Sequence, residues 1–371
     1  MYVVLNLNEL MDFCEEIEKS LLPLFGSKKC AILDVPSYSN AGDQLIWAGM
    51  EAFCAKNGIE CVYRCSNITY EYREFSSDTT ICLVGGGNFG DLWRGLQEFK
   101  NQVIMAYPNN RIIIFPQSVF YEDMSLCYMD STIFAQHKDI YICARDNESY
   151  VFLQRHFKNH VLLVPDMVLY LSFDKRVLGA QYKTLFMMRK DKETTKYDDL
   201  LKAGMDILDW PTHELIGVNK IDSFTNEHAW LHRLLRIGLQ LKLGNRLLRA
   251  LYSTASCKLL KAIRNINVPV ADRWELTQLE VNYLMYLNRK HSGALNEIVN
   301  TMLYENYMPL TSEYAIDFMN QYDEVYSTRL HGGILAMLLG KKVHMIDNSY
   351  GKISALYNTW LTKKANIDMV Q

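Results

Sequence analysis

The sequence predicts an α/β protein with two Rossmann-like domains that face each other across a cleft. Three observations lead to this class. Short apolar runs alternate with helical segments along most of the chain, which is typical of parallel sheets covered by helices on both faces. Polar loops follow the carboxyl ends of these runs, where open α/β sheets bind their ligands. The length of 371 residues suits two domains of about 100–200 residues each.

The first domain is expected over residues 1–175. It begins with an amphipathic helix in the first 30 residues, where Phe13, Ile17 and Leu21 follow helical spacing. The later segments end at Gly, Pro, Asn or Asp, which interrupt regular structure. Strands are expected at 30–36, 60–65, 111–118 and 160–171, a helix at 43–58, a strand entering a glycine loop at 79–93, and a strand followed by a helix at 139–154.

The second domain is expected over residues 176–345. Its first strand covers 183–193, a second segment follows at 206–211, and a strand, loop, helix and strand occupy 323–347. A helical insertion separates these parts at about 206–289. The last residues, 346–371, are expected to form a C-terminal helix that packs back on the first domain. Two α/β halves closed in this way predict a site in the space between them.

A basic segment, residues 226–270, is the most unusual part of the insertion. It contains eight Lys and Arg residues and a single acid, Glu227. Its local charge of +7, against a net −3 for the whole chain, leaves about −10 for the remainder. Trp230 and several leucines recur near helical spacing. The segment is therefore expected either to lie on an anionic membrane surface or to pack on its own protein with a solvated basic face.

The composition argues against several classes of protein. A net charge of −3 disfavours a nucleic-acid partner. The nine cysteines are scattered without a Cys-x-x-Cys pair, so we expect reduced thiols and no metal site. The acidic N-terminus lacks the pattern of a secretory signal, and no run of 18 apolar residues occurs. These features predict a cytoplasmic protein.

The loop at residues 37–46 follows the first expected strand. Gly42 permits a tight turn, while Asn40 and Asp43 are residues that favour helix N-caps. The side chain of Asp43 is placed at the carboxyl edge of the sheet, where a carboxylate can bind sugar hydroxyls or act as a base. Capping of the next helix and a role in the site both remain open for this loop.

The glycine segment at residues 84–91 formally matches a dinucleotide fingerprint, Gly-x-Gly-x-x-Gly. The next strand ends in Phe-Pro-Gln-Ser and lacks the acid that such a domain needs for the ribose. The segment therefore indicates a site lined by backbone N–H groups rather than a nicotinamide domain. Gly86, Gly87 and Asn88 are the candidate binding residues.

Two further polar loops follow strands of the first domain. Arg145 and Asp146 end one strand and begin a helix, so they either bind substrate or form an ion pair that orients the loop. Asp166 follows the last strand, and helix or turn capping is the default expectation for it.

Residues 327–341 form the most informative segment. Arg329 and His331 fall in the turn between an apolar strand and an apolar helix, and Gly332 opens that helix. The helix N-terminus offers unpaired N–H groups, arginine offers a planar fork for phosphate or carboxylate, and histidine can exchange a proton near neutral pH. An anion site is predicted here, with Arg189 and Lys190 at the end of another strand as further cationic groups.

The chain resembles the polysaccharide pyruvyl transferase family from about Ala31 to Lys352, outside the basic insertion. The resemblance lies in the order and spacing of these segments: NAGDQLI, VGGGNFGDLW, FPQS, ARDNES, VPD, STRLHGGILA and NSYGK. It implies two domains arranged as in GT-B glycosyltransferases. It also implies phosphoenolpyruvate as donor and a sugar hydroxyl pair as acceptor, with Arg329, Leu330 and His331 binding the donor. The insertion departs from the family pattern, so no acceptor residues are assigned.

The resemblance and the anion site together suggest a mechanism. Arg329, the Gly332 end of the helix and Arg189 would bind the phosphate and carboxylate of the donor. His331 would serve as the acid, and Asp43 or Asp146 as the base that activates a hydroxyl. The enol donor is already activated, so no metal or nicotinamide cofactor is expected. The acceptor is expected to be a sugar or a polyprenyl-linked oligosaccharide at the inner face of the cytoplasmic membrane, reached through the basic segment.

Other functions remain as alternatives. A GT-B glycosyltransferase would respond to a nucleoside diphosphate instead of phosphoenolpyruvate. A nicotinamide-dependent oxidoreductase is disfavoured by the missing acid. A non-catalytic scaffold anchored by the basic segment would bind donor without releasing phosphate.

Overall fold

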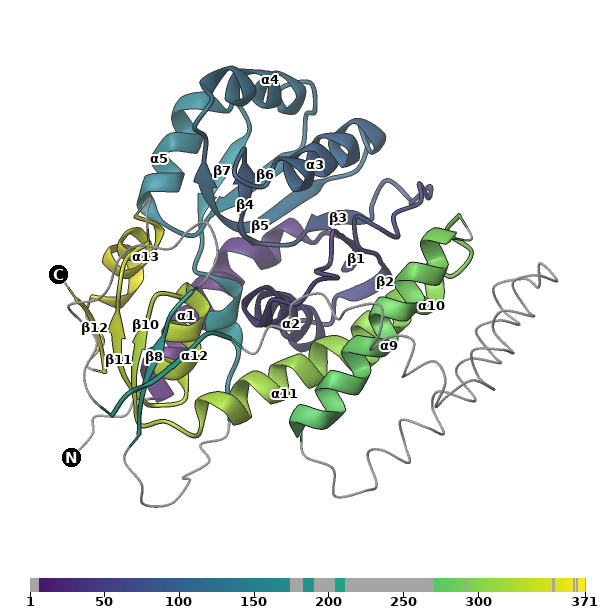
Figure 1. Ribbon diagram of the computed structural model, residues 1–371. Helices are drawn as coiled ribbons and strands as arrows, with labels where there is room; N and C mark the ends of the chain where they lie inside the picture. Colours follow the sequence, from purple (N-terminus) through teal and green to yellow (C-terminus); the bar gives the residue numbers. More distant parts are fainter. Residues whose placement is uncertain are drawn as a thin grey trace, which may run out of the picture. The chain divides into compact units, whose positions relative to one another are not determined.

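The computed structural model describes residues 7–173, 183–189, 204–210, 270–290, 292–348, 351–362, 364 and 366–370 (Figure 1). By its internal contacts the chain forms two compact units. One comprises residues 1–67, 71–211 and 318–371, and the other comprises 68–70 and 212–317. Both sheets belong to the first unit, so the polar residues discussed below lie within one compact body. The basic segment 226–270 and Lys190 lie outside the described residues, apart from Val270.

The first sheet is parallel, with strand order β2-β1-β3-β5-β6-β7 and β4 paired to β5. Its strands are β1 (Lys29–Leu33), β2 (Glu60–Arg64), β3 (Thr80–Leu83), β4 (Gly86–Gly90), β5 (Ile112–Phe120), β6 (Ile140–Ala144) and β7 (His160–Leu163). Its central strands β1, β3, β5 and β6 are almost wholly buried, as expected for a sheet covered on both faces. The prediction of an α/β fold with parallel sheets is confirmed.

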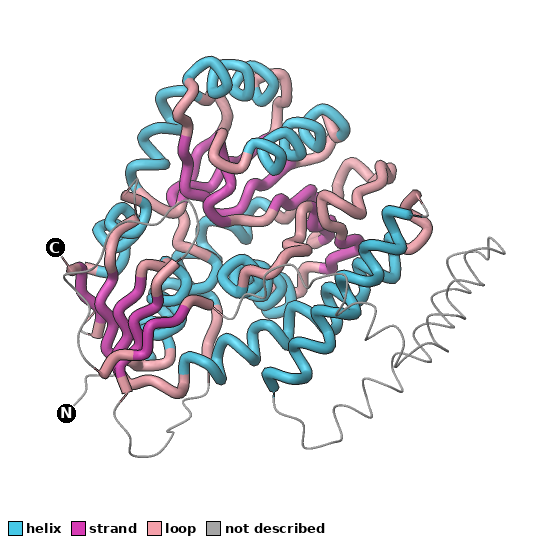
Figure 2. Tube along the Cα trace, viewed as in Figure 1, coloured by secondary structure: helices cyan, strands magenta, loops and turns pink. Residues whose placement is uncertain are grey.

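Helices connect these strands and cover the sheet, as Figure 2 shows. They are α1 (Leu7–Leu21), η1 (Leu22–Leu24), α2 (Ala41–Lys56), α3 (Arg94–Ala106), α4 (Met124–Phe134), α5 (Asn147–His156) and η2 (Met167–Tyr170). The predicted strand at 160–171 is too long, because Asp166 accepts a hydrogen bond from the Val168 N–H and begins η2. The buried face of α1 includes Phe13, Ile17 and Leu21, as its spacing predicts.

The glycine segment is a strand and not the predicted loop. β4 pairs with β5 in parallel, with Gly86 opposite Gln117 and Gly90 opposite Phe120. A Cβ on Gly90 would lie 1.8 Å from the Phe120 carbonyl oxygen, so only glycine permits this approach of the two backbones. The glycines therefore serve strand packing, and the segment does not open a helix as a dinucleotide loop would.

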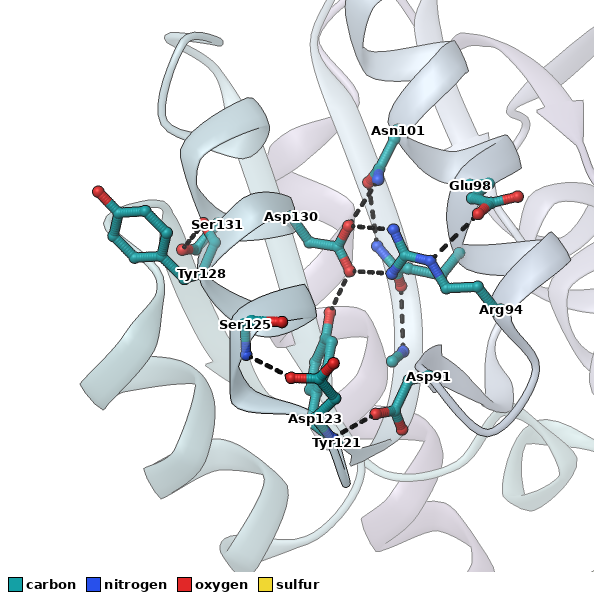
Figure 3. A network of polar contacts seen from close by, with 12 residues as sticks. Asp91, Arg94, Glu98, Asn101, Tyr121, Asp123, Ser125, Tyr128, Asp130 and Ser131 are labelled. Carbon is teal, nitrogen blue, oxygen red and sulfur yellow. Dashed lines mark hydrogen bonds and ion pairs between the residues drawn. The ribbon is translucent and has the colours of Figure 1, made fainter.

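A buried polar network fixes the end of β4 (Figure 3). Asp130 on α4 is fully buried and accepts two hydrogen bonds from Arg94, at 2.6 and 2.8 Å, and one from Asn101. Asn101 in turn accepts from Gln97, and Gln97 accepts from the Gly90 N–H at 3.1 Å. The network ties α3, α4 and β4 together, so the glycine strand has a fixed position.

The second sheet is also parallel, with strand order β12-β11-β10-β8-β9. Its elements are β8 (Thr184–Met187), β9 (Asp206–Leu208), β10 (Glu324–Ser327), α12 (Leu330–Leu338), β11 (Lys342–Met345), α13 (Lys352–Leu356), the π-helix η5 (Tyr357–Leu361) and β12 (Ile367–Met369). The sequence predicts only a helix after residue 346, so β12 was missed. Helix α12 packs against α2 and η2 as well as against its own sheet.

From residue 270 onward the second unit is mainly helical. Its helices are α9 (Val270–Lys290), α10 (Asn296–Met302), the π-helix η4 (Leu303–Tyr307) and α11 (Met308–Met319). Trp274 of α9 is buried and donates a hydrogen bond to Thr311 of α11. The described end of the predicted insertion is therefore a packed helix.

Candidate active site

Three residues from distant parts of the sequence meet at the carboxyl edge of the first sheet. Arg145 follows β6, Asp166 follows β7, and His331 lies in the first turn of α12. Arg145 Nη1 lies 2.7 Å from Asp166 Oδ2, and His331 Nε2 lies 3.1 Å from the same oxygen. Arg145 Nη1 and His331 Nε2 are 3.2 Å apart. Since a carboxylate only accepts hydrogen bonds, Asp166 Oδ2 accepts one from Arg145 and one from His331.

The cluster is deeply buried, and its charges are matched. Arg145 and Asp166 are each 1% exposed. Burial acts to raise the pKa of Asp166, but the neighbouring His331 and Arg145 outweigh it and hold that pKa well below its ordinary value. Asp166 is therefore an anion at neutral pH, which fixes Arg145 and orients the imidazole. Asp166 was predicted only as a cap, which it is for η2, and its contacts with Arg145 and His331 are a second role that was not predicted.

Gly42 explains how His331 fits beside α2. A Cβ on Gly42 would lie 2.7 Å from His331 Nδ1, a distance that a side chain cannot occupy. The imidazole therefore packs on the first turn of α2, with Nδ1 toward Gly42 and Nε2 toward Asp166. Gly42 was predicted as a binding residue, and the structure gives it the role of making room for the histidine.

Asp43 and Asn40 form a second polar group at this edge. Asn40 caps α2 by accepting from the Gly42 N–H at 3.0 Å, as predicted. Asp43 Oδ2 accepts from Asn40 Nδ2 at 2.8 Å and from the Tyr38 hydroxyl at 2.9 Å. Among the described residues no hydrogen bond reaches Asp43 Oδ1, which lies 3.6 Å from the position of a Cβ on Gly86. This oxygen is available to a ligand.

Asp146 is held in a different way. Its Oδ1 accepts from the Ser149 N–H at 2.7 Å and caps α5, while its Oδ2 accepts from the Ser118 hydroxyl at 2.7 Å. The residue is 1% exposed. Both oxygens are engaged in positioning the loop, so of the two base candidates Asp43 has the better geometry.

Gly87 lies next to two cationic groups. A Cβ on Gly87 would lie 3.5 Å from Arg145 Nη2 and 3.6 Å from Lys352 Nζ. Lys352 begins α13 and was not predicted as a site residue, although it closes the NSYGK segment. A C-terminal helix that packs back on the first domain was expected, but not that it would bring Lys352 to β4. Two positive side chains lie beside a glycine that has no side chain to cover its backbone. This arrangement favours the binding of an anion next to Gly87.

Asn88 has a buried partner. Lys100 Nζ donates to Asn88 Oδ1 at 2.8 Å and lies 3.6 Å from Asp34 Oδ2. Burial lowers the pKa of Lys100 and raises the pKa of Asp34 to about 6. The hydrogen bond from the buried Lys100 therefore fixes the Asn88 side chain.

Arg329 is engaged by an acid that the sequence analysis did not name. Its Nε and Nη2 donate to Asp209 at 2.8 and 2.7 Å, a planar two-point ion pair. Leu330 is buried in α12. The side-chain position at Gly332 is filled by Met187, whose Sδ would lie 2.2 Å from a Cβ, so Gly332 is required for helix-to-sheet packing.

Arg189 is buried at the end of β8, where its N–H donates to the Thr328 hydroxyl at 2.9 Å. Within the described parts of the chain, no three His, Cys, Asp or Glu side chains are arranged to hold a metal ion. All eight cysteines among those residues are free thiols.

Comparison with known proteins identifies the family. The model of the polysaccharide pyruvyl transferase family matches residues 40–350. The pyruvyl transferase EpsO of Bacillus subtilis is 27% identical over 340 residues, covering 91% of this chain and 87% of EpsO. Pyruvyl transferase 1 of Schizosaccharomyces pombe is 32% identical over 182 residues, 45% of each chain. The chain belongs to the polysaccharide pyruvyl transferase family, and it is a polysaccharide pyruvyltransferase.

One solved structure has a similar fold. The crystal structure of an uncharacterised protein of Klebsiella pneumoniae superimposes with a TM-score of 0.53, covers 99% of this chain and all of its own, and is 18% identical. That likeness concerns the fold. In the described part of this chain, no helix has the length and apolarity needed to cross a membrane.

Proposed function

We propose that this enzyme transfers the pyruvyl group of phosphoenolpyruvate to a pair of sugar hydroxyls and forms a cyclic ketal. The observation that carries the proposal is the meeting of His331, Arg145 and Asp166 beside the glycine strand. A proton donor next to an anion-binding surface is what an enol phosphate donor needs. Family membership supports pyruvyl transfer, and the donor and the acceptor linkage are our inference.

The donor carries a phosphate and a carboxylate, so it requires more than one cationic group. Arg145 Nη2 and Lys352 Nζ supply two of them next to Gly87. Arg329, the first turn of α12 and Arg189 remain our candidates for the other anionic group. In this structure Arg329 is bound to Asp209, so donor binding through Arg329 would share or replace that ion pair. Lys190 stays a prediction outside the described residues.

The proposed reaction consists of a protonation at C3 of the donor, two additions of hydroxyl groups at C2 and the departure of phosphate. A proton added to C3 of the donor makes a methyl group and leaves an electron-deficient C2. The first sugar hydroxyl adds to C2 and loses its proton, inorganic phosphate leaves with the electrons of the C2–O bond, and the second hydroxyl adds and loses its proton. The products are the ketal and phosphate. No external oxidant or reductant takes part.

We assign the acid to His331 and the base to Asp43. Nε2 of His331 is committed to Asp166, so Nδ1 is the nitrogen that faces the Asn40–Asp43 turn. Asp43 offers an unpaired Oδ1 at the same turn, whereas both oxygens of Asp146 are occupied. General acid–base catalysis of this kind contributes about 10²–10⁴-fold to the rate.

We further propose that the two α/β halves bind donor and acceptor in a GT-B-like arrangement, and that the acceptor is lipid-linked. The basic segment 226–270 would bind anionic lipid, at about 1 kcal/mol per basic residue near the surface. Flotation with liposomes tests this point, since equal recovery with and without anionic lipid contradicts it.

A phosphate-release assay tests the proposed reaction. The wild-type enzyme is incubated with phosphoenolpyruvate and a polyprenyl-linked oligosaccharide, and inorganic phosphate is measured over time. Phosphate release that requires both compounds supports the proposal. Release of a nucleoside diphosphate from a nucleotide sugar with the same acceptor, or no phosphate release with any hydroxyl acceptor, contradicts it.

A further inference from the structure

Tyr38 stands out among the residues around the site. It lies in the loop between β1 and α2, at the carboxyl edge of the sheet, and its side chain is 40% exposed. Its hydroxyl is nonetheless fixed, because it donates to Asp43 Oδ2 at 2.9 Å. A tyrosine held by its polar tip presents an immobile apolar ring to solvent.

The hydrogen bonds of Asp43 explain why this tyrosine concerns the reaction. Tyr38 and Asn40 both donate to Oδ2, so they fix the carboxylate while leaving Oδ1 open. Oδ1 lies 3.6 Å from the position that a Cβ on Gly86 of β4 would take, so no side chain of that residue covers it. The adjacent Ser39 hydroxyl is buried without a hydrogen-bond partner among the described residues. The loop therefore presents an apolar ring and an open carboxylate oxygen, with an unsatisfied hydroxyl buried beside them.

A pyranose ring matches these groups. Each pyranose has a C–H face that packs on an aromatic ring and an edge of hydroxyls that donate hydrogen bonds. Binding sites combine apolar surface with a few fixed polar groups in this way. Because His331 packs on Gly42 in the same turn, a sugar hydroxyl bonded to Asp43 would also approach the proton donor.

We propose that Tyr38 and Asp43 form the acceptor subsite, with a pyranose packed on the Tyr38 ring and one of its hydroxyls donating to Asp43 Oδ1. This inference rests on the proposed function. Tyr38 then has two separable roles, since its ring binds the sugar and its hydroxyl positions the base.

Two substitutions separate these roles. Tyr38→Leu removes both the aromatic face and the hydroxyl, so we expect kcat to fall as in Tyr38→Phe and the KM for the acceptor to rise about 3- to 10-fold, as the loss of an aromatic contact predicts. Tyr38→Phe keeps the face and removes the hydroxyl, so kcat falls while the acceptor KM changes little. The KM for phosphoenolpyruvate stays at the wild-type value in both. Tyr128, which is 75% exposed on α4, provides matched Leu and Phe controls.

The experiment uses methyl pyranosides of galacto, gluco and manno configuration with the full-length protein. Saturation-transfer NMR without donor measures sugar binding, and phosphate release with phosphoenolpyruvate measures turnover. Sugar binding that weakens in Tyr38→Leu and not in Tyr128→Leu supports the subsite, even if no phosphate is released, in which case the proposed reaction alone fails. Equal sugar binding by wild type and Tyr38→Leu, or no binding of any pyranoside by the wild type, overturns the inference.

Discussion

Asp166 holds the imidazole of His331 from 165 residues away, with Oδ2 lying 3.1 Å from Nε2. The same oxygen binds Arg145 at 2.7 Å. One buried carboxylate therefore links the last strand of the first sheet, the helix α12 of the second and the β6–α5 loop. The geometry of the site depends on this shared acceptor.

Replacing Asp166 by Asn tests the electrostatic part of that account. The pKa of Asp166 is lowered in the folded protein, so its charge stabilises the fold above the unfolded pKa of about 3.9, and that stability is lost as the pH falls further. We expect Asp166→Asn to cost about 3 kcal/mol at pH 7, with the difference from wild type shrinking below about pH 4. Urea denaturation across pH measures it, and a difference that does not depend on pH contradicts it.

Gly42→Ala tests the packing of His331 on α2. The added Cβ would fall 2.7 Å from Nδ1, so the imidazole must move away from its position. Because small misplacements of a catalytic group cost about 10²-fold, kcat should fall by that order while the circular dichroism spectrum stays unchanged. Gly95→Ala is the control, since nothing lies within 4 Å of a Cβ there. If Gly42→Ala keeps the wild-type kcat, Nδ1 of His331 takes no part in the reaction.

Substitution of the two acids distinguishes the base from the cap. Asp43→Asn should lower kcat by about 10²–10⁴-fold with little change in Tm, because Asp43 lies in a partly exposed turn. Asp146→Ala should mainly lower the stability, by about 0.5–2 kcal/mol for the lost cap. Thermal denaturation and steady-state kinetics on both variants decide between them. The reverse pattern would make Asp146 the base.

Lys352→Gln tests the anion site beside Gly87. Removing this charge should raise the KM for phosphoenolpyruvate about tenfold, the effect of losing one charge-assisted hydrogen bond, while the acceptor KM stays constant. Lys56→Gln serves as a control, because Lys56 is exposed and pairs with Glu18. An unchanged donor KM in Lys352→Gln would exclude Lys352 from donor binding.

Local patterns in the sequence predicted much of the fold and part of the site. Apolar runs located most strands, and Asn40 was recognised as a cap from its residue type and position. The loops after β1, β6 and β7 were correctly placed at one edge of the sheet. Gly86–Gly90 was misassigned as a loop, because glycine is rare in strands and only the close approach of Phe120 to Gly90 requires it.

The remaining site residues depend on contacts between distant segments. Asp166 was identified only as a cap, since a local pattern cannot show that Arg145 and His331 meet it. Lys352 reaches Gly87 only because the helix that follows the second sheet returns to β4. The Asp209 partner of Arg329 likewise lies 120 residues away.

The most direct test of the proposed reaction is mass spectrometry of the acceptor. Wild-type enzyme, phosphoenolpyruvate and a polyprenyl-linked oligosaccharide are incubated together, alongside His331→Ala. We predict that the acceptor gains one carboxyethylidene group with wild type and that phosphate is released in equal amount. His331→Ala should remain folded and yield little product. An unmodified acceptor with wild type, or full ketal formation with His331→Ala, would contradict the account.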